Sequence, residues 1–216
     1  MFMAGAAWEL ISRYFMRHLP LYVALILLFT TGLGFGALAT QKLSPMQKED
    51  LANYTAAVYA SLAENGSERT ERAQAFLQSI QDNVIKTAGL VFLLGLTVIG
   101  APLILAVVFA RGFVLGFTVG FLVQDAAVKG LVLSTTCILP HNALVIPALL
   151  LGAEGALSFA GSAFRTLTGL SRESVQGQLA TTALLAICSG LLFVAAAFVE
   201  TYITPVLVQL GRGFLT

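Results

Sequence analysis

Long apolar runs with almost no charged residues are the feature that most constrains the fold of this chain. They lie at 19–40, 87–124, 130–164 and 174–199. A membrane-spanning helix needs about 20 consecutive apolar residues and satisfies its backbone polar groups internally. The runs therefore predict an all-α, polytopic integral membrane bundle of about five transmembrane helices, because the run at 87–124 is long enough for two.

The balance of residue types agrees with a lipid environment and excludes several function classes. Hydrophobic residues make up 57% of the chain and charged residues only 11%, well below the roughly 25% of a soluble domain. The net charge of +1 provides no field for nucleic acid, so no nucleic-acid partner is expected. Cys137 and Cys188 lie in apolar runs without a ligand pattern, so we expect buried thiols and no disulfide, metal or cofactor.

Charge is concentrated in one segment, 41–86, which is the only sizeable region expected in water. It separates a first span at 19–40, preceded by the segment 1–18, from a membrane domain at 87–216. Ser44 and Gln47 form a capping box around Pro45, and Asn65-Gly66 ends the helix that they begin. Two apolar stripes follow at helical spacing: Leu51, Tyr54, Val58 and Leu62, then Ala73, Phe76, Leu77, Ile80 and Val84.

These stripes predict an amphipathic helical hairpin. Its two stripes either pack on each other, or dock a partner, or lie on the bilayer surface.

Prolines and one arginine interrupt the longer apolar runs. We expect a helix that kinks near Pro102 and ends near Phe109, with Arg111 at its water-facing end and a short helix after it. Pro140 and Pro147 predict a broken helix or a pair of half-helices at 130–164, which either crosses once or enters and returns.

A repeated small-residue motif lies in the second run. Gly112, Gly116 and Gly120 share one helical face, with phenylalanines at the same spacing one residue on. Such a face lets another backbone approach closely. The motif predicts a helix-packing interface, either within one chain or between protomers of a homo-oligomer.

Polar residues inside the third run are candidates for function. His141 and Asn142 follow Pro140 directly, and they either bond to carbonyls freed by the proline or line a cavity or gate. Glu154 is 13 residues beyond His141, about 20 Å along a straight helix, so the two cannot form an acid–base pair. We expect Glu154 near an interface or paired with Arg165 or Arg111, and an intramembrane carboxylate is a functional candidate by default.

Catalytic motifs and loop charges bear on enzymatic activity and on orientation in the membrane. The chain has no HExxH, GxSxG or Walker pattern, which favours a protein without its own catalytic activity. Counting Lys and Arg in the loops gives five on the side of the N-terminus and seven on the other, a mild preference for an external N-terminus.

Three segments together resemble stage II sporulation protein M. They are Leu43–Leu51 (LSPMQKEDL), Gly112–Val123 (GFVLGFTVGFLV) and Ile138–Pro147 (ILPHNALVIP). The resemblance implies five spans, a cytoplasmic N-terminus, an extracytoplasmic hairpin at 41–86 and a cytoplasmic loop near 165–174. It also implies a scaffold in the mother-cell septal or engulfing membrane of an endospore former. Its expected partners are stage II sporulation proteins P and D, which degrade septal peptidoglycan.

One departure from the wider family bears on chemistry. Relatives outside spore formers often carry Pro-His-Gly followed by a glutamate, whereas this chain has Asn142 and Val145 at those two positions. The absent His–Glu pair favours a structural role for His141. A channel or transporter-like subunit, motivated by the intramembrane prolines and polar residues, is the alternative to the scaffold.

Overall fold

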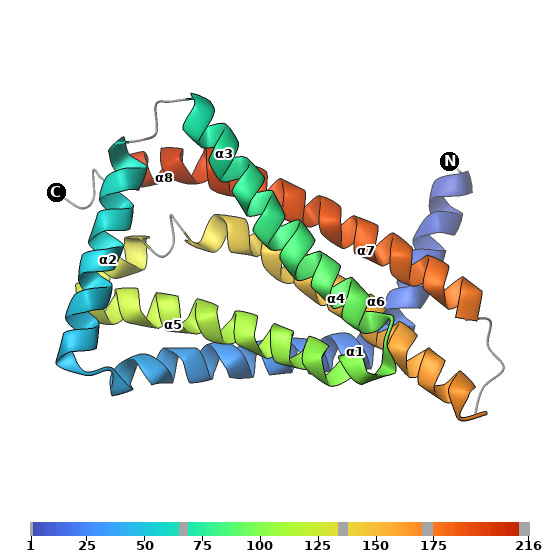
Figure 1. The fold of residues 1–216 in the computed structure, drawn as a ribbon. Coiled ribbons are helices and arrows are strands. Elements are labelled where there is room, and N and C mark those ends of the chain that lie inside the picture. The colour runs from blue at the N-terminus through green and yellow to red at the C-terminus, as the bar shows by residue number, and fades with distance from the viewer. Residues whose placement is uncertain (1, 65–68, 134–137, 170–174, 212–216) are drawn as a thin grey trace.

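Helices account for all regular structure in the part of the chain that this computed structural model describes, residues 2–64, 69–133, 138–169 and 175–211. The fold class expected from the apolar runs is therefore confirmed (Figure 1). The principal helices are α1 (Phe2–Ala39), α2 (Pro45–Glu64), α3 (Arg69–Ile80), α4 (Leu90–Gly95), α5 (Ala101–Leu133), α6 (Leu139–Leu167), α7 (Val175–Phe198) and α8 (Thr204–Gly211). Two π-helices, η2 (Gln81–Gly89) and η5 (Val199–Ile203), and two 3₁₀ turns, η1 (Thr40–Lys42) and η3 (Val98–Gly100), connect them.

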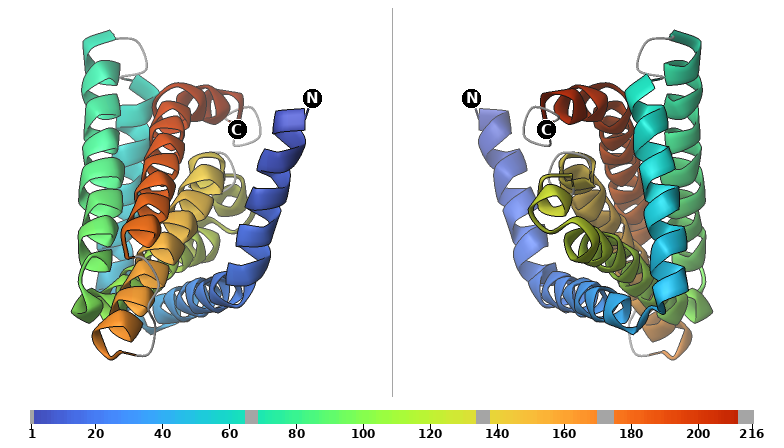
Figure 2. Two further views of the ribbon diagram at one scale, coloured as in Figure 1. Left: turned by 90° about the vertical axis from the view of Figure 1, so that its right-hand side faces the viewer. Right: turned by 90° about the vertical axis from the view of Figure 1, so that its left-hand side faces the viewer.

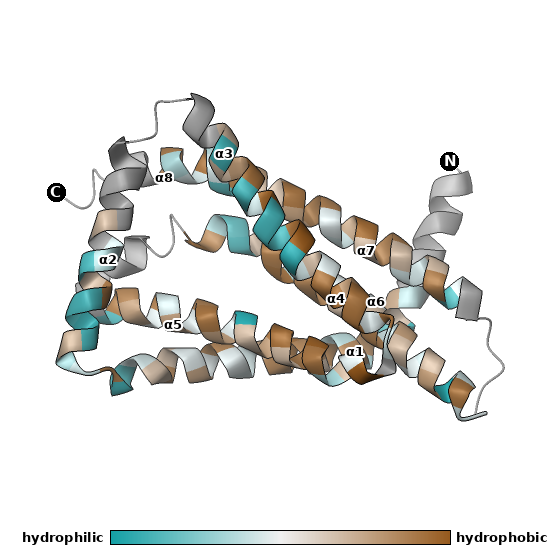
Figure 3. Ribbon diagram, viewed as in Figure 1, coloured by the Kyte–Doolittle hydropathy of each residue, from teal (hydrophilic) through white to brown (hydrophobic). Residues whose placement is uncertain are grey.

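Four helical segments of the described residues are long and apolar enough to cross a membrane: Tyr14–Lys42, Ala101–Gln124, Leu139–Leu167 and Gly177–Leu207. Figure 3 shows apolar residues along α4, α6 and α7, whereas polar residues are frequent on α2 and α3. The first helix begins at Phe2, so residues 2–18 are helical and continuous with the apolar run that begins at Leu19. Its course bends at the N-terminal part (Figure 2), where Pro20 lies inside the helix.

Glycines bring α1 and α5 into backbone contact. A Cβ on Gly36 would lie 2.7 Å from Phe117 N and closer still to Phe113 O, and a Cβ on Gly116 would meet the backbone of Leu33 just as closely. The glycine motif of α5 therefore packs against α1 of the same chain. Because the paired residue numbers rise together, α1 and α5 run parallel, so the chain must return between them.

That return is made by α3, η2 and α4, one continuous helix (Arg69–Gly95) of about 40 Å at 1.5 Å per residue. The chain thus passes along the bundle five times, and its two ends lie at opposite ends of it (Figure 1). This corrects the expected helix through Pro102 to Phe109. The break lies at 96–100, Pro102 is the second residue of α5, and Arg111 lies inside α5.

The antiparallel pair α6 and α7 completes the bundle. Ser189 Oγ donates to the Ala148 carbonyl at 2.6 Å and Thr182 Oγ1 to the Gly155 carbonyl at 3.1 Å, so α7 is hydrogen-bonded to the backbone of α6. Of the run at 130–164, residues 130–133 end α5, 134–137 lie outside the described residues, and 139–167 form one helix that Pro147 does not break. Pro140 begins α6 and only Pro147 lies within it. The buried core includes Leu25, Val91, Ile104, Val108, Ala148 and Phe193.

The segment 41–86 differs from a compact hairpin. α2 and α3 diverge from their connection (Figure 1). The main partners of α3 outside its own helix are α7 and η5, and α2 contacts α8. The second apolar stripe of the segment is therefore used inside the bundle and not against the first stripe.

Candidate functional site

A buried carboxylate lies in the middle of α6. Glu154 is 0% exposed. His18 Nδ1 lies 2.7 Å from Glu154 Oε1, and Tyr14 and Tyr22 donate hydrogen bonds to Oε2 from their hydroxyls at 2.9 and 3.2 Å. A buried carboxylate is costly unless it is paired and hydrogen-bonded, and these three side chains provide both. We call these four residues the Glu154 cluster.

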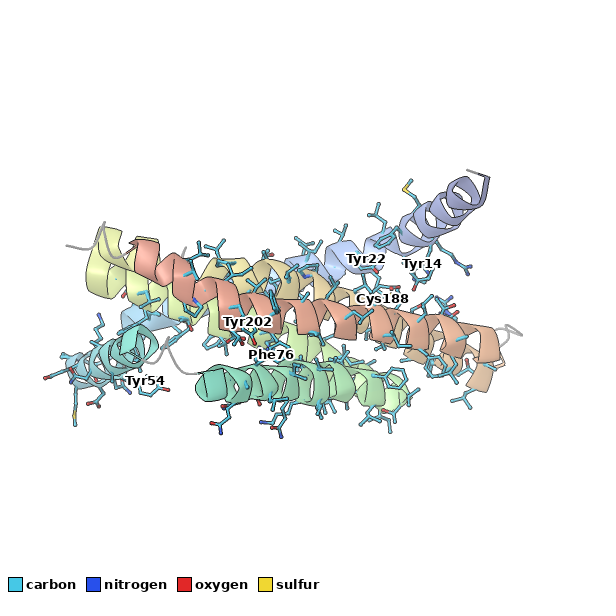
Figure 4. The ribbon with its side chains drawn as sticks, turned by 90° about the horizontal axis from the view of Figure 1, so that it is seen from above. Tyr14, Tyr22, Tyr54, Phe76, Cys188 and Tyr202 are labelled. Carbon is cyan, nitrogen blue, oxygen red and sulfur yellow. The ribbon has the colours of Figure 1, made fainter. Side chains whose placement is uncertain are left out.

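The cluster is built by the spacing of α1. Tyr14, His18 and Tyr22 are four residues apart, so they lie on one face of the helix. In Figure 4 the labelled Tyr14 and Tyr22 lie on the side of α1 that faces the rest of the bundle. The rings of Tyr14 and His18 also stack, with centroids 4.4 Å apart. The expected pairing of Glu154 with Arg165 or Arg111 is wrong, and the spacing on α1 was the signal that could have found the true partners.

A second polar network crosses the bundle at the π-helices. Arg111 of α5 donates hydrogen bonds to Asn83 Oδ1 at 3.3 Å and to Thr87 Oγ1 at 2.5 Å, both in η2. Asn83 Nδ2 donates to Ser79 Oγ at 3.3 Å, and Ser79 Oγ donates to Glu200 Oε2 in η5 at 2.6 Å. We call these five residues the Arg111 network. It shows that Arg111 is satisfied inside the bundle and does not mark the end of a span.

The Pro140-His141-Asn142 motif lies in the first turn of α6. Asn142 Nδ2 donates to the carbonyl of Ile138 at 2.9 Å and lies 3.3 Å from His141 Nε2. The amide therefore satisfies a backbone carbonyl at the beginning of the helix. Asn142 also lines an apolar cavity of about 600 Å³ between α1, α5 and α6. Glu154 lies on the same helix, and its partners His18, Tyr14 and Tyr22 come from α1.

The predicted docking residues fall into two groups. Tyr54 is 72% exposed and Leu77 is 65% exposed, whereas Leu51, Phe76 and Ile80 are half-buried. Phe76 points toward Tyr202 (Figure 4), with ring centroids 6.2 Å apart. Of the five docking candidates whose side chains the structure describes, Tyr54 and Leu77 are the most accessible to a partner. The side chains of Val58 and Leu62 lie outside the described residues.

The cysteines differ from expectation in one respect. Cys188 is a free thiol on the exposed surface of α7, so its predicted burial is wrong. A lipid-facing position and a buried position have the same apolar surroundings in the sequence, which explains the error. Cys137 lies outside the described residues.

Comparisons with known proteins identify a family. The family model described as Stage II sporulation protein M matches residues 25–205. This range includes α2, the glycine motif and every residue of the Arg111 network. No match was found among curated proteins or among solved structures.

Proposed function

Because this chain belongs to the stage II sporulation protein M family and is therefore a sporulation-related membrane protein, we propose that it is a non-enzymatic scaffold. It recruits stage II sporulation proteins P and D to the septal and engulfing membrane of the mother cell. Those proteins hydrolyse peptidoglycan, and this chain determines where they act. The family match over 25–205 is the observation that carries the proposal.

The exposed part of 41–86 supports a docking role. Tyr54 is a large aromatic side chain, 72% exposed, on a helix at the edge of the bundle. Tyrosine is enriched among the residues that dominate binding energy in protein interfaces. Leu77 adds a second exposed apolar side chain on α3. We place this surface outside the cell, on the side of the membrane where peptidoglycan lies.

The alternative function, a channel or transporter subunit, loses part of its support. It was motivated by the intramembrane prolines and the polar residues near them, and α6 (Leu139–Leu167) continues through Pro147 without a break. The two buried polar networks that do cross the bundle consist of side chains bonded to one another. They serve packing without requiring a transported solute.

The docking surface can be tested with charge substitutions. Tyr54→Asp removes an exposed aromatic ring and places a charge at the proposed contact, while the buried residues of the bundle stay unchanged. We expect recovery of proteins P and D with the affinity-tagged chain from sporulating cells to fall at least about tenfold, the effect of losing one dominant interface residue. Quantitative mass spectrometry of the detergent-solubilised complex gives the ratio of each hydrolase to the chain.

Three further variants make the result specific. Asn53→Asp adds the same charge at the neighbouring exposed position, so its recovery should match the wild type. Leu77→Asp should lower the recovery of the hydrolases as Tyr54→Asp does. Phe76→Asp should instead lower the thermal stability, because the ring of Phe76 packs against Tyr202. Normal recovery of both hydrolases with Tyr54→Asp and with Leu77→Asp would overturn docking on this surface.

A further inference from the structure

A polar cavity lies beside the Glu154 cluster, at the end of the bundle opposite α2. It measures about 600 Å³, is open on one side and is bordered by α1, α6 and α7. Its wall includes Arg17, His18, Ser158, Ser162, Arg165 and Gln178. The function proposed above makes no use of it.

The cavity lies at the ends of three membrane-spanning segments. Arg17 and His18 directly precede the uncharged run 19–40, and α6 ends at Leu167. Arg165 is two residues from that end, and Gln178 belongs to the beginning of α7. The charged part of the cavity is therefore near the level of the lipid headgroups, whereas Leu21 and Leu157 form its apolar part.

Two arginines contribute guanidinium groups to the wall of the cavity. Arg17 and Arg165 both line it and are exposed. The carboxylate of Glu154 already accepts from His18 and the two tyrosines, so it is occupied by other donors. Within the described ranges no carboxylate forms an ion pair with Arg165. A guanidinium binds phosphate oxygens through two parallel hydrogen bonds.

Neutral donors line the same cavity. Gln178 Nε2 donates to Ser158 Oγ at 2.9 Å, and this hydroxyl lies 3.4 Å from His18 Nδ1. Ser162 and Thr181 contribute further hydroxyls. Hydroxyl and amide donors beside arginine are the groups that bind a phosphate with its attached glycerol.

We propose that this cavity binds the phosphate headgroup of an anionic glycerophospholipid, with Arg17 and Arg165 as the principal ligands. The apolar residues below the arginines accommodate the beginning of the acyl chains. Basic pockets between transmembrane helices are suited to such headgroups. The chain would thereby prefer membranes or membrane zones rich in anionic lipid, a property independent of which protein docks on α2.

The test uses the full chain purified in an uncharged detergent. Short-chain phosphatidylglycerol, short-chain phosphatidylcholine and inorganic phosphate are titrated separately, and bound ligand is counted by native mass spectrometry. We expect phosphatidylglycerol to bind, and its Kd to rise at least about tenfold in the double variant Arg17→Gln/Arg165→Gln, which loses two charge-assisted contacts. The single variant Arg165→Gln changes only an exposed side chain and should give an intermediate Kd with an unchanged melting temperature.

A matched control removes the same charge elsewhere. Lys42→Gln/Lys48→Gln deletes two exposed positive charges at the other end of the bundle, and its affinity should stay within about twofold of the wild type, since the interaction of distant surface charges is screened. Phosphate binding with the same dependence on the arginines, but without preference for the lipid, would support the anion site and identify a soluble phosphate compound as its ligand. Equal losses in the arginine and lysine variants, or equally tight binding of phosphatidylcholine, would overturn the proposal.

Discussion

The close backbone contact of α1 and α5 at their glycines, which we call the glycine seam, can be tested because Gly34 and Gly36 of α1 differ in their surroundings. A Cβ on Gly36 would lie 2.7 Å from Phe117 N, whereas a Cβ on Gly34 would meet nothing within 4 Å. Both positions belong to the same turn of α1. The variants Gly36→Ala and Gly34→Ala therefore add the same methyl group to the same helix, one against a backbone and one into open space.

The expected magnitude follows from these distances. Ordinary van der Waals contact begins at 3.4 Å, so α1 and α5 must part by at least 0.7 Å to accept the methyl group at Gly36. Overpacking of this kind costs about 1–3 kcal/mol. At Gly34 the higher helix propensity of alanine contributes up to about 1 kcal/mol in the stabilising direction. Gly120 is intermediate, because its added Cβ would lie 3.0 Å from Ala37 Cα.

Thermal unfolding in detergent, followed by the loss of the monodisperse peak in size-exclusion chromatography, measures these effects. For a chain of this size about 1 kcal/mol shifts Tm by about 2–4 °C. We expect Gly36→Ala and Gly116→Ala to lose several degrees, Gly120→Ala to lose less, and Gly34→Ala to stay at or above the wild-type Tm. Equal Tm values for Gly36→Ala and Gly34→Ala would refute the claim that Gly36 allows close backbone contact between α1 and α5.

The polar networks give two further predictions. Glu154→Ala should cost about 3–5 kcal/mol, because it leaves His18 and two tyrosine hydroxyls buried without their acceptor; a wild-type Tm would contradict this. Arg111→Ala should lower the free energy of unfolding by about 1–3 kcal/mol, because Asn83 and Thr87 lose their donor. An unchanged Tm in the same assay would exclude a structural role for the Arg111 network.

Hydropathy was sufficient for the fold class but not for the ends of helices. A charge in an apolar run can mark a water-facing end or be satisfied inside a bundle, and the sequence pattern is the same. Arg111 was assigned to a helix end because its acceptors, Asn83 and Thr87, belong to another helix and carry no motif that points to it. The predicted kink near Pro102 was wrong for a related reason: a proline in an apolar run can mark a kink or the first turn of a helix, and Pro102 lies in the first turn of α5.

The Glu154 cluster shows what a closer reading of periodicity could have found. The four-residue spacing of Tyr14, His18 and Tyr22 puts three hydrogen-bonding side chains on one face of a membrane helix. Such a face needs a buried acceptor, and Glu154 is the intramembrane carboxylate nearest the middle of a span. What the sequence could not provide is the neighbourhood of α1 and α6, because 140 residues separate Tyr14 from Glu154.

Stripes on the segment 41–86 were ambiguous for a different reason. An apolar stripe records that a face is buried, but not against which element. Phe76 and Ile80 belong to a stripe that packs on α7 and η5, so a charge at Phe76 tests folding and a charge at Tyr54 tests docking. This distinction decides which variants can address the scaffold role.

Specific contacts, and not apolar area, must hold this bundle together, because lipid tails are as apolar as the helices and give no general drive for helices to associate. Each contact system described here joins segments far apart in sequence. The glycine seam joins α1 to α5, the Glu154 cluster joins α1 to α6, and the Arg111 network joins α5 to η2 and η5. Because α1 takes part in two of them, displacing α1 by Gly36→Ala should also disturb the cavity between α1, α6 and α7. The Kd for phosphatidylglycerol should therefore rise in this variant, which gives a second test of the contact between α1 and α5.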